Sequence, residues 1–357
     1  MAQETPIPAP GDAEYAAMTE MIYGLINTQL VYVVAKLGIA ELLADGAKSV
    51  DELAAMTGAH APTLRRVLRL LATKEVFTQL DEDRFASNAR AGCLRSDVPR
   101  SLKPMAEYYG SHWNWTSWSN LLEAVRTGRT AFDIAHSMSL FTYLEQHPED
   151  GAVFDRYMTA IPTWPTQAVA AAYDFSDKRL VIDVGGGLGA FLTAILERNP
   201  GVRGVLFDLP DVLARARQAI ATTTVADRFE FVAGDMFESV PRGGDVYIFS
   251  NIIHDWDDER AIRVLRNCRR AMSDGSVLLI REQVLPEEAP PAPAVRTDVV
   301  MLVLTGGKQR SESEFRSLLA NADLRLARVL PLEAGGALIE AVPVQSHASG
   351  VPRHESP

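Results

Sequence analysis

The sequence predicts an α/β protein in two parts, in which a mainly α-helical N-terminal region containing a winged helix precedes a domain with a parallel sheet. Two patterns predict this division. In the first part apolar residues recur at three- and four-residue intervals, as on buried helix faces, whereas from Leu180 short apolar strands alternate with helices. With 357 residues, the chain is long enough for two domains.

The composition is that of an ordinary folded protein, with 47% hydrophobic and 23% charged residues. Its 35 basic and 46 acidic residues give a net charge of −11, which disfavours attraction to nucleic acid or anionic lipid, so we expect a small-molecule partner. No apolar run approaches the roughly 20 residues that span a bilayer, and the first residues lack a secretion signal. We therefore expect a cytoplasmic protein without membrane partners. Two cysteines are too few for a disulfide framework.

The first helices are expected between Ala13 and about Leu43, and they are rich in apolar surface. Their apolar residues at helical spacing are Met18, Met21, Ile22, Leu25, Ile26, Leu30, Val33, Val34 and Leu37. Residues 1–12 and 346–357 are rich in proline and small polar residues, so we expect flexible tails there.

A winged helix is predicted within residues 48–90. Ser49–Ala54 begins one helix, Ala61 begins a second, and Val76–Phe85 has the pattern of a hairpin. Such a module raises the alternative of DNA binding through its second helix. The region carries seven basic and six acidic residues, which is a mixed surface. We therefore favour a packing or dimerising role and place a dimerisation domain at residues 13–100.

The second domain is predicted at residues 101–345 and opens with helices that carry an aromatic cluster at residues 112–118. Leu338–Pro343 is expected to close the sheet at its edge. The parallel sheet itself is predicted from five short apolar strands, which are Leu180–Val184, Gly204–Phe207, Phe229–Val232, Asp245–Phe249 and Val277–Ile280.

A glycine turn follows the first strand, at the place where α/β sheets bind nucleotides. Gly185, Gly187 and Ala190 satisfy the dinucleotide pattern G-x-G-x-x-G/A. Asp183, however, puts a carboxylate at the strand end, where it would repel a pyrophosphate. S-adenosylmethionine (SAM) has no phosphate, and a carboxylate favours the ammonium of its amino-acid end. The charge of Asp183 therefore favours SAM over NAD.

Two further acids stand at the ends of the second and third strands. Asp208 lies 25 residues after Asp183 (208 − 183), where an acidic side chain can bind both ribose hydroxyls of a nucleoside. Asp235 can accept a hydrogen bond from the adenine amine, and Met236 and Phe237 supply apolar contact. Each aspartate alone suits a turn or cap, but three strand-end acids in order favour a SAM site.

His254 follows the fourth strand, at the edge of the sheet where such folds place function. A phenol has a pKa of about 10 and is a poor nucleophile at pH 7, so its methylation calls for a base such as neutral imidazole. Glu282, 28 residues later (282 − 254), ends the next strand and is predicted to orient His254 and stabilise its imidazolium form. The alternative for a lone histidine is a capping or core role.

Together these motifs resemble the plant caffeate and flavonoid O-methyltransferases and their bacterial relatives that tailor antibiotics, all of which depend on SAM. The resemblance extends from Ala13 to Val344. Besides the winged-helix region, it rests on Asp183-Val-Gly-Gly-Gly-Leu-Gly, Phe207-Asp-Leu-Pro, Gly234-Asp-Met-Phe, His254-Asp-Trp-Asp-Asp-Glu, Asp298-Val-Val-Met-Leu and Gly306-Gly-Lys.

The resemblance implies a homodimer with interlocked N-terminal helices and a C-terminal Rossmann-like catalytic domain. It also implies base-assisted transfer of a methyl group from SAM to a phenolic hydroxyl of an aromatic secondary metabolite, which leaves S-adenosylhomocysteine (SAH). His254 and Glu282 are the catalytic candidates. The cofactor candidates are Asp183, Gly185, Gly187, Asp208, Leu209, Asp235, Met236, Phe237, Ser250 and Trp256. The substrate candidates are Trp115, Phe154, Met158, Asp255, Met301 and Gln309.

The chain departs from the plant pattern at two positions. Gln309 stands where many plant members have a second histidine-orienting glutamate, and an amide can hydrogen-bond but carries no charge. Ser250 stands where plant members have a SAM-contacting lysine, which leaves part of the cofactor's contacts unassigned.

Other functions remain open at this point. Some relatives bind SAM but hydroxylate or decarboxylate their substrates, and C- or N-methylation uses the same cofactor geometry. A DNA-binding regulator that responds to SAM is the alternative from another class. No metal site is expected, because the chain offers a histidine base in place of clustered magnesium-binding acids.

Overall fold

A computed structural model describes residues 9–160, 166–288, 292–332 and 336–344. Residues 1–8 and 345–357 lie outside this range, so the expected C-terminal tail and most of the N-terminal one are not covered. The chain divides into two compact units. The first comprises Met1–Thr116 with Ala152–Ala160, and the second comprises Ser117–Gly151 with Ile161–Pro357. The domain boundary at residue 100 stays a prediction.

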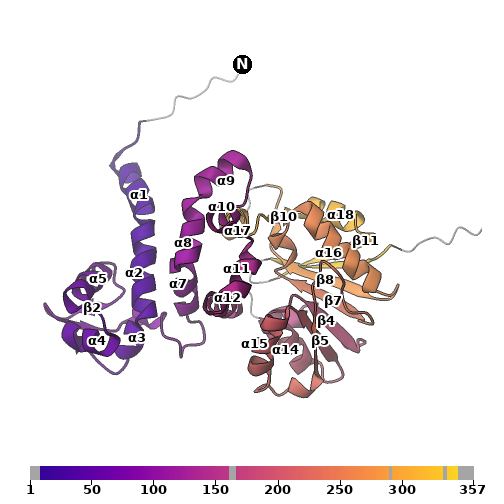
Figure 1. Cartoon of the computed structure of the whole chain (residues 1–357), viewed down its shortest axis with the longest axis horizontal. Helices are drawn as coiled ribbons and strands as arrows, with labels where there is room; N and C mark the ends of the chain where they lie inside the picture. Colours follow the sequence, from indigo (N-terminus) through magenta and orange to yellow (C-terminus); the bar gives the residue numbers. More distant parts are fainter. Residues whose placement is uncertain (1–8, 161–165, 289–291, 333–335, 345–357) are drawn as a thin grey trace, which may run out of the picture. The chain divides into compact units, whose positions relative to one another are not determined.

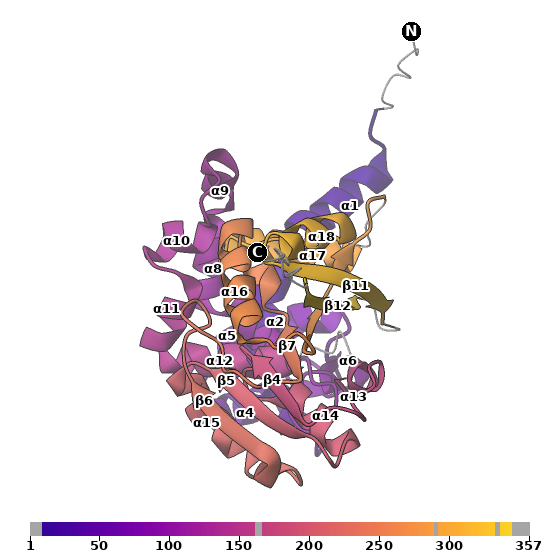
Figure 2. The same ribbon diagram turned by 90° about the vertical axis from the view of Figure 1, so that its right-hand side faces the viewer.

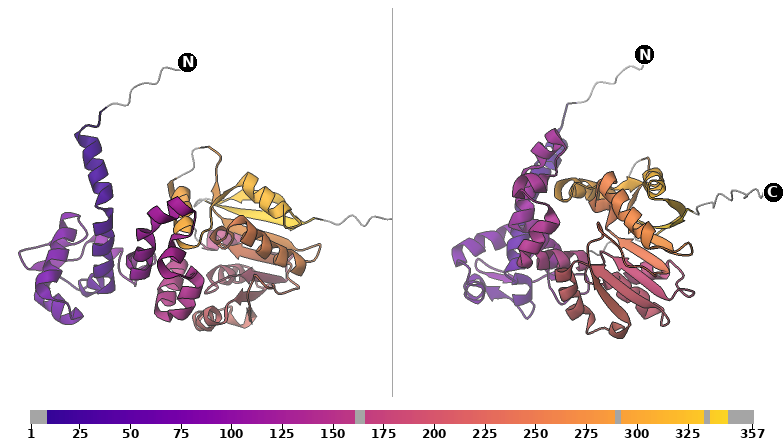
Figure 3. Two further views of the ribbon diagram at one scale, coloured as in Figure 1. Left: turned by 45° about the horizontal axis from the view of Figure 1, so that its top comes forward. Right: turned by 45° about the vertical axis from the view of Figure 1, so that its right-hand side comes forward.

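The first unit begins with α1 (Asp12–Ile22), α2 (Gly24–Lys36) and α3 (Ile39–Leu42), within the segment expected to be helical. Figure 3 shows α1 and α2 following one another nearly in line. Apolar side chains of these two helices are 40–76% exposed, and they are Tyr15, Met18, Met21, Ile22, Leu25 and Ile26. This segment therefore presents a large apolar face.

The expected helix, helix and hairpin follow in that order. At the start of α4 (Val50–Thr57), the Ser49 hydroxyl accepts a hydrogen bond from the Glu52 amide, and the Glu52 carboxylate accepts one from the Ser49 amide, which forms a capping box. In α5 (Ala61–Thr73), Leu64, Leu68 and Leu71 fall on one buried face. The small antiparallel sheet has the order β1-β3-β2, and its strands are β1 (Lys48–Ser49), β2 (Thr78–Gln79) and β3 (Arg84–Ala86).

More helices complete the α-helical region, and α8 and α12 each cross the boundary between the units. In the first unit the Tyr108 ring stacks on Tyr157, with centroids 4.1 Å apart, and meets Trp113 edge-on. The helices are α6 (Ala89–Gly92), α7 (Lys103–Gly110), α8 (His112–Ser119), α9 (Leu121–Thr127), α10 (Ala131–His136), α11 (Leu140–Gln146), α12 (Pro148–Ala160) and α13 (Thr166–Ala171).

The second unit is built on a seven-stranded sheet of order β11-β12-β8-β7-β4-β5-β6 (Figures 1 and 2). The five predicted strands are present and pair in parallel. They are β4 (Leu180–Val184), β5 (Arg203–Asp208), β6 (Phe229–Ala233), β7 (Val246–Ser250) and β8 (Val277–Glu282).

The end of the chain differs from the prediction. β12 (Ala337–Pro343) was expected at the edge, but it lies inside the sheet, antiparallel to β8. The edge strand is β11 (Leu324–Pro331), which pairs antiparallel with β12. Two exposed arginines, Arg325 and Arg328, interrupt the apolar residues of β11, so a search for apolar runs misses this strand. The sheet is therefore mixed rather than wholly parallel.

Apolar side chains cover both faces of the sheet and form two cores. One face packs against α14 (Ala190–Arg198) and α15 (Pro210–Ile220). The other packs against α16 (Asp258–Ala271) and α18 (Glu312–Ala320). The remaining elements are η1 (Ala226–Arg228), η2 (Ile253–Asp255), α17 (Ala292–Leu304), and the strand pair β9 (Val284–Leu285) and β10 (Arg310–Ser311).

The carboxyl ends of β4, β5, β6, β7 and β8 meet along one edge of the sheet, because all five run in the same direction. This arrangement gathers residues that are far apart in sequence. Within the described ranges, no helix is both long and apolar enough to cross a membrane.

Candidate active site

The turn after β4 requires glycine. Gly185 and Gly187 have φ angles of 69° and 58°, in the left-handed region that favours glycine. A Cβ at Gly186 would lie 2.4 Å from Leu206 Cδ1 and 2.7 Å from Asp183 Oδ2. A Cβ at Gly187, by contrast, would meet no atom within 4 Å. The turn is therefore packed on one side and open on the other.

Asp208 joins β5 to this turn. Its Oδ2 accepts a hydrogen bond of 2.9 Å from the Gly187 amide, and its Oδ1 accepts one of 2.7 Å from the Leu209 amide. The Gly185 amide also donates to the Phe207 carbonyl. The structure thus brings Gly185, Gly187, Asp208 and Leu209 together, as their assignment to one cofactor site requires.

Asp183 lies beneath the glycine turn and is 1% exposed. Neither of its carboxylate oxygens has a hydrogen-bond partner among the residues that the structure describes. Burial raises the pKa of Asp183 to about 7, the nearby Asp208 charge adds to the increase, and Arg281 opposes it. Asp183 was expected to favour the ammonium of SAM, and its burial places it behind the backbone of the turn.

Arg281, on β8, is a neighbour that sequence reasoning missed. It is 7% exposed, its Nη1 donates to Ser250 Oγ at 3.1 Å, and its guanidinium lies 5.1 Å from the centroid of the Phe191 ring. Ser250 and Arg281 are register partners in β7 and β8. A cation therefore lies beside Ser250, where plant relatives have a lysine. The signal in the sequence is the arginine within the apolar run of β8.

The residues after β6 meet Trp256. Asp235 is exposed, and its Oδ1 accepts a hydrogen bond from the Phe237 amide at 2.8 Å. The rings of Phe237 and Trp256 meet edge-on, with centroids 4.7 Å apart. The Met236 carbonyl accepts a bond from Asn267 on α16. The candidates Asp235, Met236, Phe237 and Trp256 therefore form one aromatic and carboxylate cluster.

His254 lies in η2, 8% exposed, after a left-handed turn at Asn251 with φ of 56°. Its ring Nδ1 is 2.9 Å from Gln309 Nε2, and its Nε2 is 3.8 Å from Asp255 Oδ1. Burial lowers the pKa of His254 to about 4, and the charge of Arg310 adds to this effect. The imidazole is therefore neutral near pH 7.

Glu282 reaches His254 in a different way from that expected. Its Oε1 accepts a hydrogen bond of 2.9 Å from the backbone amide of His254, and the polar contact at the ring is made by Gln309. Glu282 is fully buried, and burial raises its pKa to about 7, against the lowering effects of the His254 amide and Arg310. Glu282 thus fixes the backbone that carries the imidazole.

Arg310 holds the same turn and was not predicted. It is fully buried, and its Nη1 and Nη2 donate to the carbonyls of Ile253 and Trp256 at 3.0 and 2.7 Å. Its Nε donates to Asp258 at the start of α16. No sequence motif marks this role, because the partners are backbone carbonyls more than 50 positions away.

Gly307 passes very close to this turn. A Cβ at this position would lie 1.9 Å from the His254 carbonyl oxygen and 2.7 Å from the Trp256 nitrogen. Only glycine therefore allows the segment before Gln309 to approach η2 and bring the amide to the imidazole.

The substrate candidates fall in both units. Met301 is 9% exposed on α17, and Asp255 has a pKa raised well above its usual range by burial and by Glu282. In the first unit, Phe154 packs near Tyr108 and Met158 is 40% exposed. Trp115 is half-buried on α8.

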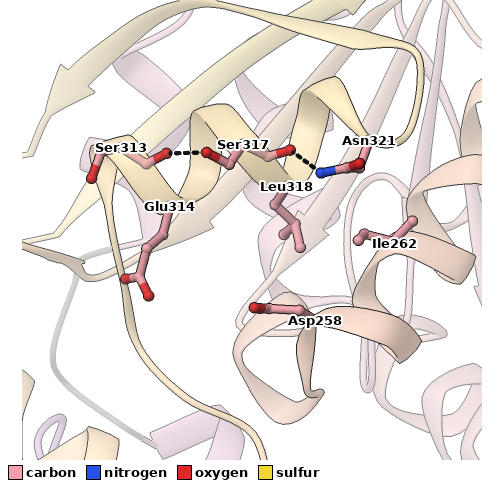
Figure 4. A pocket seen from close by; sticks show the side chains of 7 residues that line it. All are labelled: Asp258, Ile262, Ser313, Glu314, Ser317, Leu318 and Asn321. Atoms are coloured by element: carbon pink, nitrogen blue, oxygen red, sulfur yellow. Dashed lines mark hydrogen bonds between the residues drawn. The ribbon is translucent and has the colours of Figure 1, made fainter.

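A separate pocket lies between α16 and α18 (Figure 4). None of its lining residues was predicted as a site residue, and they are Asp258, Ile262, Ser313, Glu314, Ser317, Leu318 and Asn321. Asp258 connects this pocket to the His254 turn through Arg310. Across the described part of the chain, no three His, Cys, Asp or Glu side chains are grouped so that they could hold a metal ion.

Comparisons with known sequences place these features in context. An O-methyltransferase domain matches residues 118–325, and an O-methyltransferase dimerisation domain matches residues 19–96. The chain is 45% identical to the phenazine O-methyltransferase PhzM of Lysobacter antibioticus, over 92% of this chain and 96% of that one. It is 40% identical to the mitomycin biosynthesis 6-O-methyltransferase of Streptomyces lavendulae, over 91% of this chain and 95% of that one.

Two further comparisons concern ligands and reaction type. The O-methyltransferase NcsB1 from neocarzinostatin biosynthesis, solved with SAH and 1,4-dihydroxy-2-naphthoic acid, matches with a TM-score of 0.82 and 29% identity, over 91% of this chain and 98% of that one. The phenazine-1-carboxylate N-methyltransferase of Pseudomonas aeruginosa is 33% identical, over 88% of this chain and 94% of that one.

Proposed function

Because the chain belongs to the family of SAM-dependent O-methyltransferases, we propose that it methylates a phenolic hydroxyl of an aromatic secondary metabolite, with His254 as the general base. The observation that carries this assignment is the neutral imidazole of His254, held at the sheet edge by Gln309 and Glu282. O-methyltransferases of phenazine and mitomycin biosynthesis among the relatives support an aromatic acceptor in antibiotic tailoring.

The residues at the strand ends fit SAM. The glycine turn is open above Gly187, which leaves room for a ligand against the backbone. Asp208 accepts amide bonds from Gly187 and Leu209, which hold its carboxylate at the glycine turn, and a carboxylate is a suitable acceptor for ribose hydroxyls. Asp235, Met236, Phe237 and Trp256 supply a carboxylate and apolar rings suited to adenine. Bound SAM would supply an electrophilic methyl group on its sulfonium.

The chain's own residues would control the proton of the acceptor. The ring Nδ1 of His254 faces Gln309, so Nε2 is the nitrogen left for an acceptor hydroxyl. In this structure Gln309 Nε2 donates to Nδ1, which leaves the proton of the neutral imidazole on Nε2. A half-turn of the amide group would bring its oxygen to Nδ1, move the imidazole proton there and free Nε2 to act as the base. Glu282 and Arg310 fix the backbone of η2, which keeps Nε2 in place.

The first test is calorimetric titration with SAH, with NAD⁺ as the control ligand. We expect binding of SAH alone. Asp208→Ala should weaken SAH binding about tenfold or more, because it removes hydrogen bonds to a charged acceptor. The matched control is Asp211→Ala, an exposed aspartate in the first turn of α15. SAH affinity of Asp208→Ala within twofold of wild type, or preference for NAD⁺, would contradict the assigned site.

The match to a dimerisation domain supports assembly into a homodimer through the N-terminal helices, and the exposed apolar face of α1 and α2 is the surface that we assign to it. Met21 is 76% exposed on that face. Met21→Glu is expected to convert the dimer to monomer in sedimentation velocity, because a carboxylate would be buried at an apolar contact. Met56→Glu, at a 56% exposed position on α4, is the control. An undisturbed Met21→Glu dimer would exclude this face.

Methyl transfer to nitrogen is the second candidate reaction, and the related N-methyltransferase supports it. Amine acceptors should therefore be assayed beside phenols. An amine acceptor with a lone pair needs no base, so transfer to it would not depend on His254. A cytoplasmic location and independence from metal remain predictions of the sequence.

A further inference from the structure

We propose that the methyl acceptor is an acidic, electron-poor phenol, whose hydroxyl is conjugated to a carbonyl group or a ring nitrogen, and that the surroundings of His254 select for this class. The inference rests on the proposed O-methyl transfer and narrows its substrate. It follows from the groups that face the imidazole.

The polar contact at Nδ1 is uncharged. Gln309, fixed by a hydrogen bond from its backbone amide to Asp298 on α17, presents a neutral amide at 2.9 Å. A carboxylate at this position would stabilise imidazolium by direct charge pairing, and an amide does so far less. The imidazole is thus oriented without being made more basic.

The nearest acidic side chains do little to stabilise a positive charge on the His254 ring. The Glu282 carboxylate accepts a hydrogen bond from the backbone amide of His254, so it holds the main chain rather than the ring. Asp255 lies 3.8 Å from Nε2, and burial together with the Glu282 charge raises its pKa well above the usual range. Both acids are therefore poor partners for a positive charge on the ring.

A cation stands close to the same turn. Arg310 is fully buried and binds the carbonyls on either side of His254, so a proton on the imidazole would add a second positive charge nearby. Asp258 pairs with Arg310 from the start of α16, but its side chain is 55% exposed, so solvent screens its charge. Burial is the main cause of the low pKa of His254, about 4, and the charge of Arg310 adds to it.

Because its pKa is low, His254 is a weak base for an ordinary phenol. A phenol with a pKa of about 10 would give its proton to such an imidazole with an equilibrium constant of about 10⁻⁶. In the transfer, the O–H bond breaks and the O–CH₃ bond forms, while the S–CH₃ bond breaks and its electron pair stays on sulfur. An acceptor that is itself acidic has a pKa closer to that of His254, so its oxygen releases the proton more readily to His254 or to water.

The first test measures His254 itself, without any acceptor. In SAH-loaded protein with labelled histidine, the ring signal assigned with His254→Asn is expected to stay neutral down to about pH 5. Gln309→Glu should raise the pKa of His254 by about one to three units, since an opposite charge then faces Nδ1. Gln218→Glu, at an exposed position on α15, should leave it unchanged. A wild-type His254 that titrates at or above pH 6.5 would overturn the proposal.

The second test compares acceptors that have nearly the same shape but differ in acidity. Within a series of hydroxynaphthalenes, or within a series of hydroxyphenazines, ring fluorine changes the acidity of the hydroxyl with little change in size. At pH 7.5 we expect kcat/KM to be at least about 100-fold higher for members that are ionised at that pH, and Gln309→Glu should reduce this preference. Equal kcat/KM across the series would overturn the proposed substrate class while leaving O-methyl transfer intact. Failure to bind SAH would instead refute the proposed function.

Discussion

Replacement of His254 by alanine is expected to lower kcat/KM by about 10²- to 10⁴-fold, the usual contribution of a positioned base, for a phenolic acceptor that is still protonated at the assay pH. The imidazole is neutral and is held between Gln309 and the turn of η2, so it is ready to accept a proton. SAH affinity should change little, because most residues assigned to the cofactor lie at the ends of β4, β5 and β6, and the imidazole itself is not among them. Initial rates of methyl transfer and calorimetry with SAH measure the two effects separately.

His60→Ala is the matched control for this loss, since His60 is an exposed histidine at the start of α5 in the first unit. It should retain wild-type kcat/KM. With an acceptor that is protonated at the assay pH, methylation by His254→Ala within tenfold of wild type would rule out the base role. Acceptors that need no base, such as an amine or an ionised phenolate, should show a smaller loss.

Gly307→Ala is expected to disrupt the reactive turn and to destabilise the protein by about 3 kcal/mol or more, at the upper end of overpacking costs. The added Cβ would lie 1.9 Å from the His254 carbonyl oxygen and 2.4 Å from the Asp255 carbonyl carbon. Both contacts are backbone atoms pinned by Glu282 and Arg310, so neither side can yield easily. Differential scanning calorimetry should show a lower Tm, and methyl transfer should fall with it.

The control for the glycine substitution is Gly275→Ala. A Cβ at Gly275 would meet no atom within 4 Å, and its φ angle lies outside the left-handed region. Its Tm should remain close to that of wild type. If Gly307→Ala matched this control in both Tm and activity, the close approach between Gly307 and η2 would not constrain the site.

The sequence predicted the five parallel strands well, because their apolar runs are short, buried on both faces and separated by helices. The same criterion missed β11, whose arginines face away from the core. It also placed β12 at the edge, since order along the chain gives no information about which strand lies outermost. Pairing of the last two strands is decided by contacts that form only in the folded sheet.

At the site, residue types and spacing predicted that His254 and Glu282 belong together, and the family resemblance added Gln309. The structure brings both Glu282 and Gln309 into hydrogen-bond contact with His254. Spacing did not predict which atoms meet. Whether Glu282 reaches the ring or the backbone depends on how η2 turns, and that turn is set by Arg310 and Gly307. Arg310 was invisible in sequence because its partners are carbonyls, which every residue possesses.

The buried guanidinium of Arg310 also has a consequence for motion. Its donors bind Ile253, Trp256 and Asp258, so one side chain joins η2 to the first turn of α16 and to β10. The His254 imidazole therefore belongs to the same cooperative unit as these elements and does not fray independently of them. The edge of the sheet to which we assign catalysis is preorganised, so we expect any local opening that admits ligands to occur in segments that Arg310 does not hold.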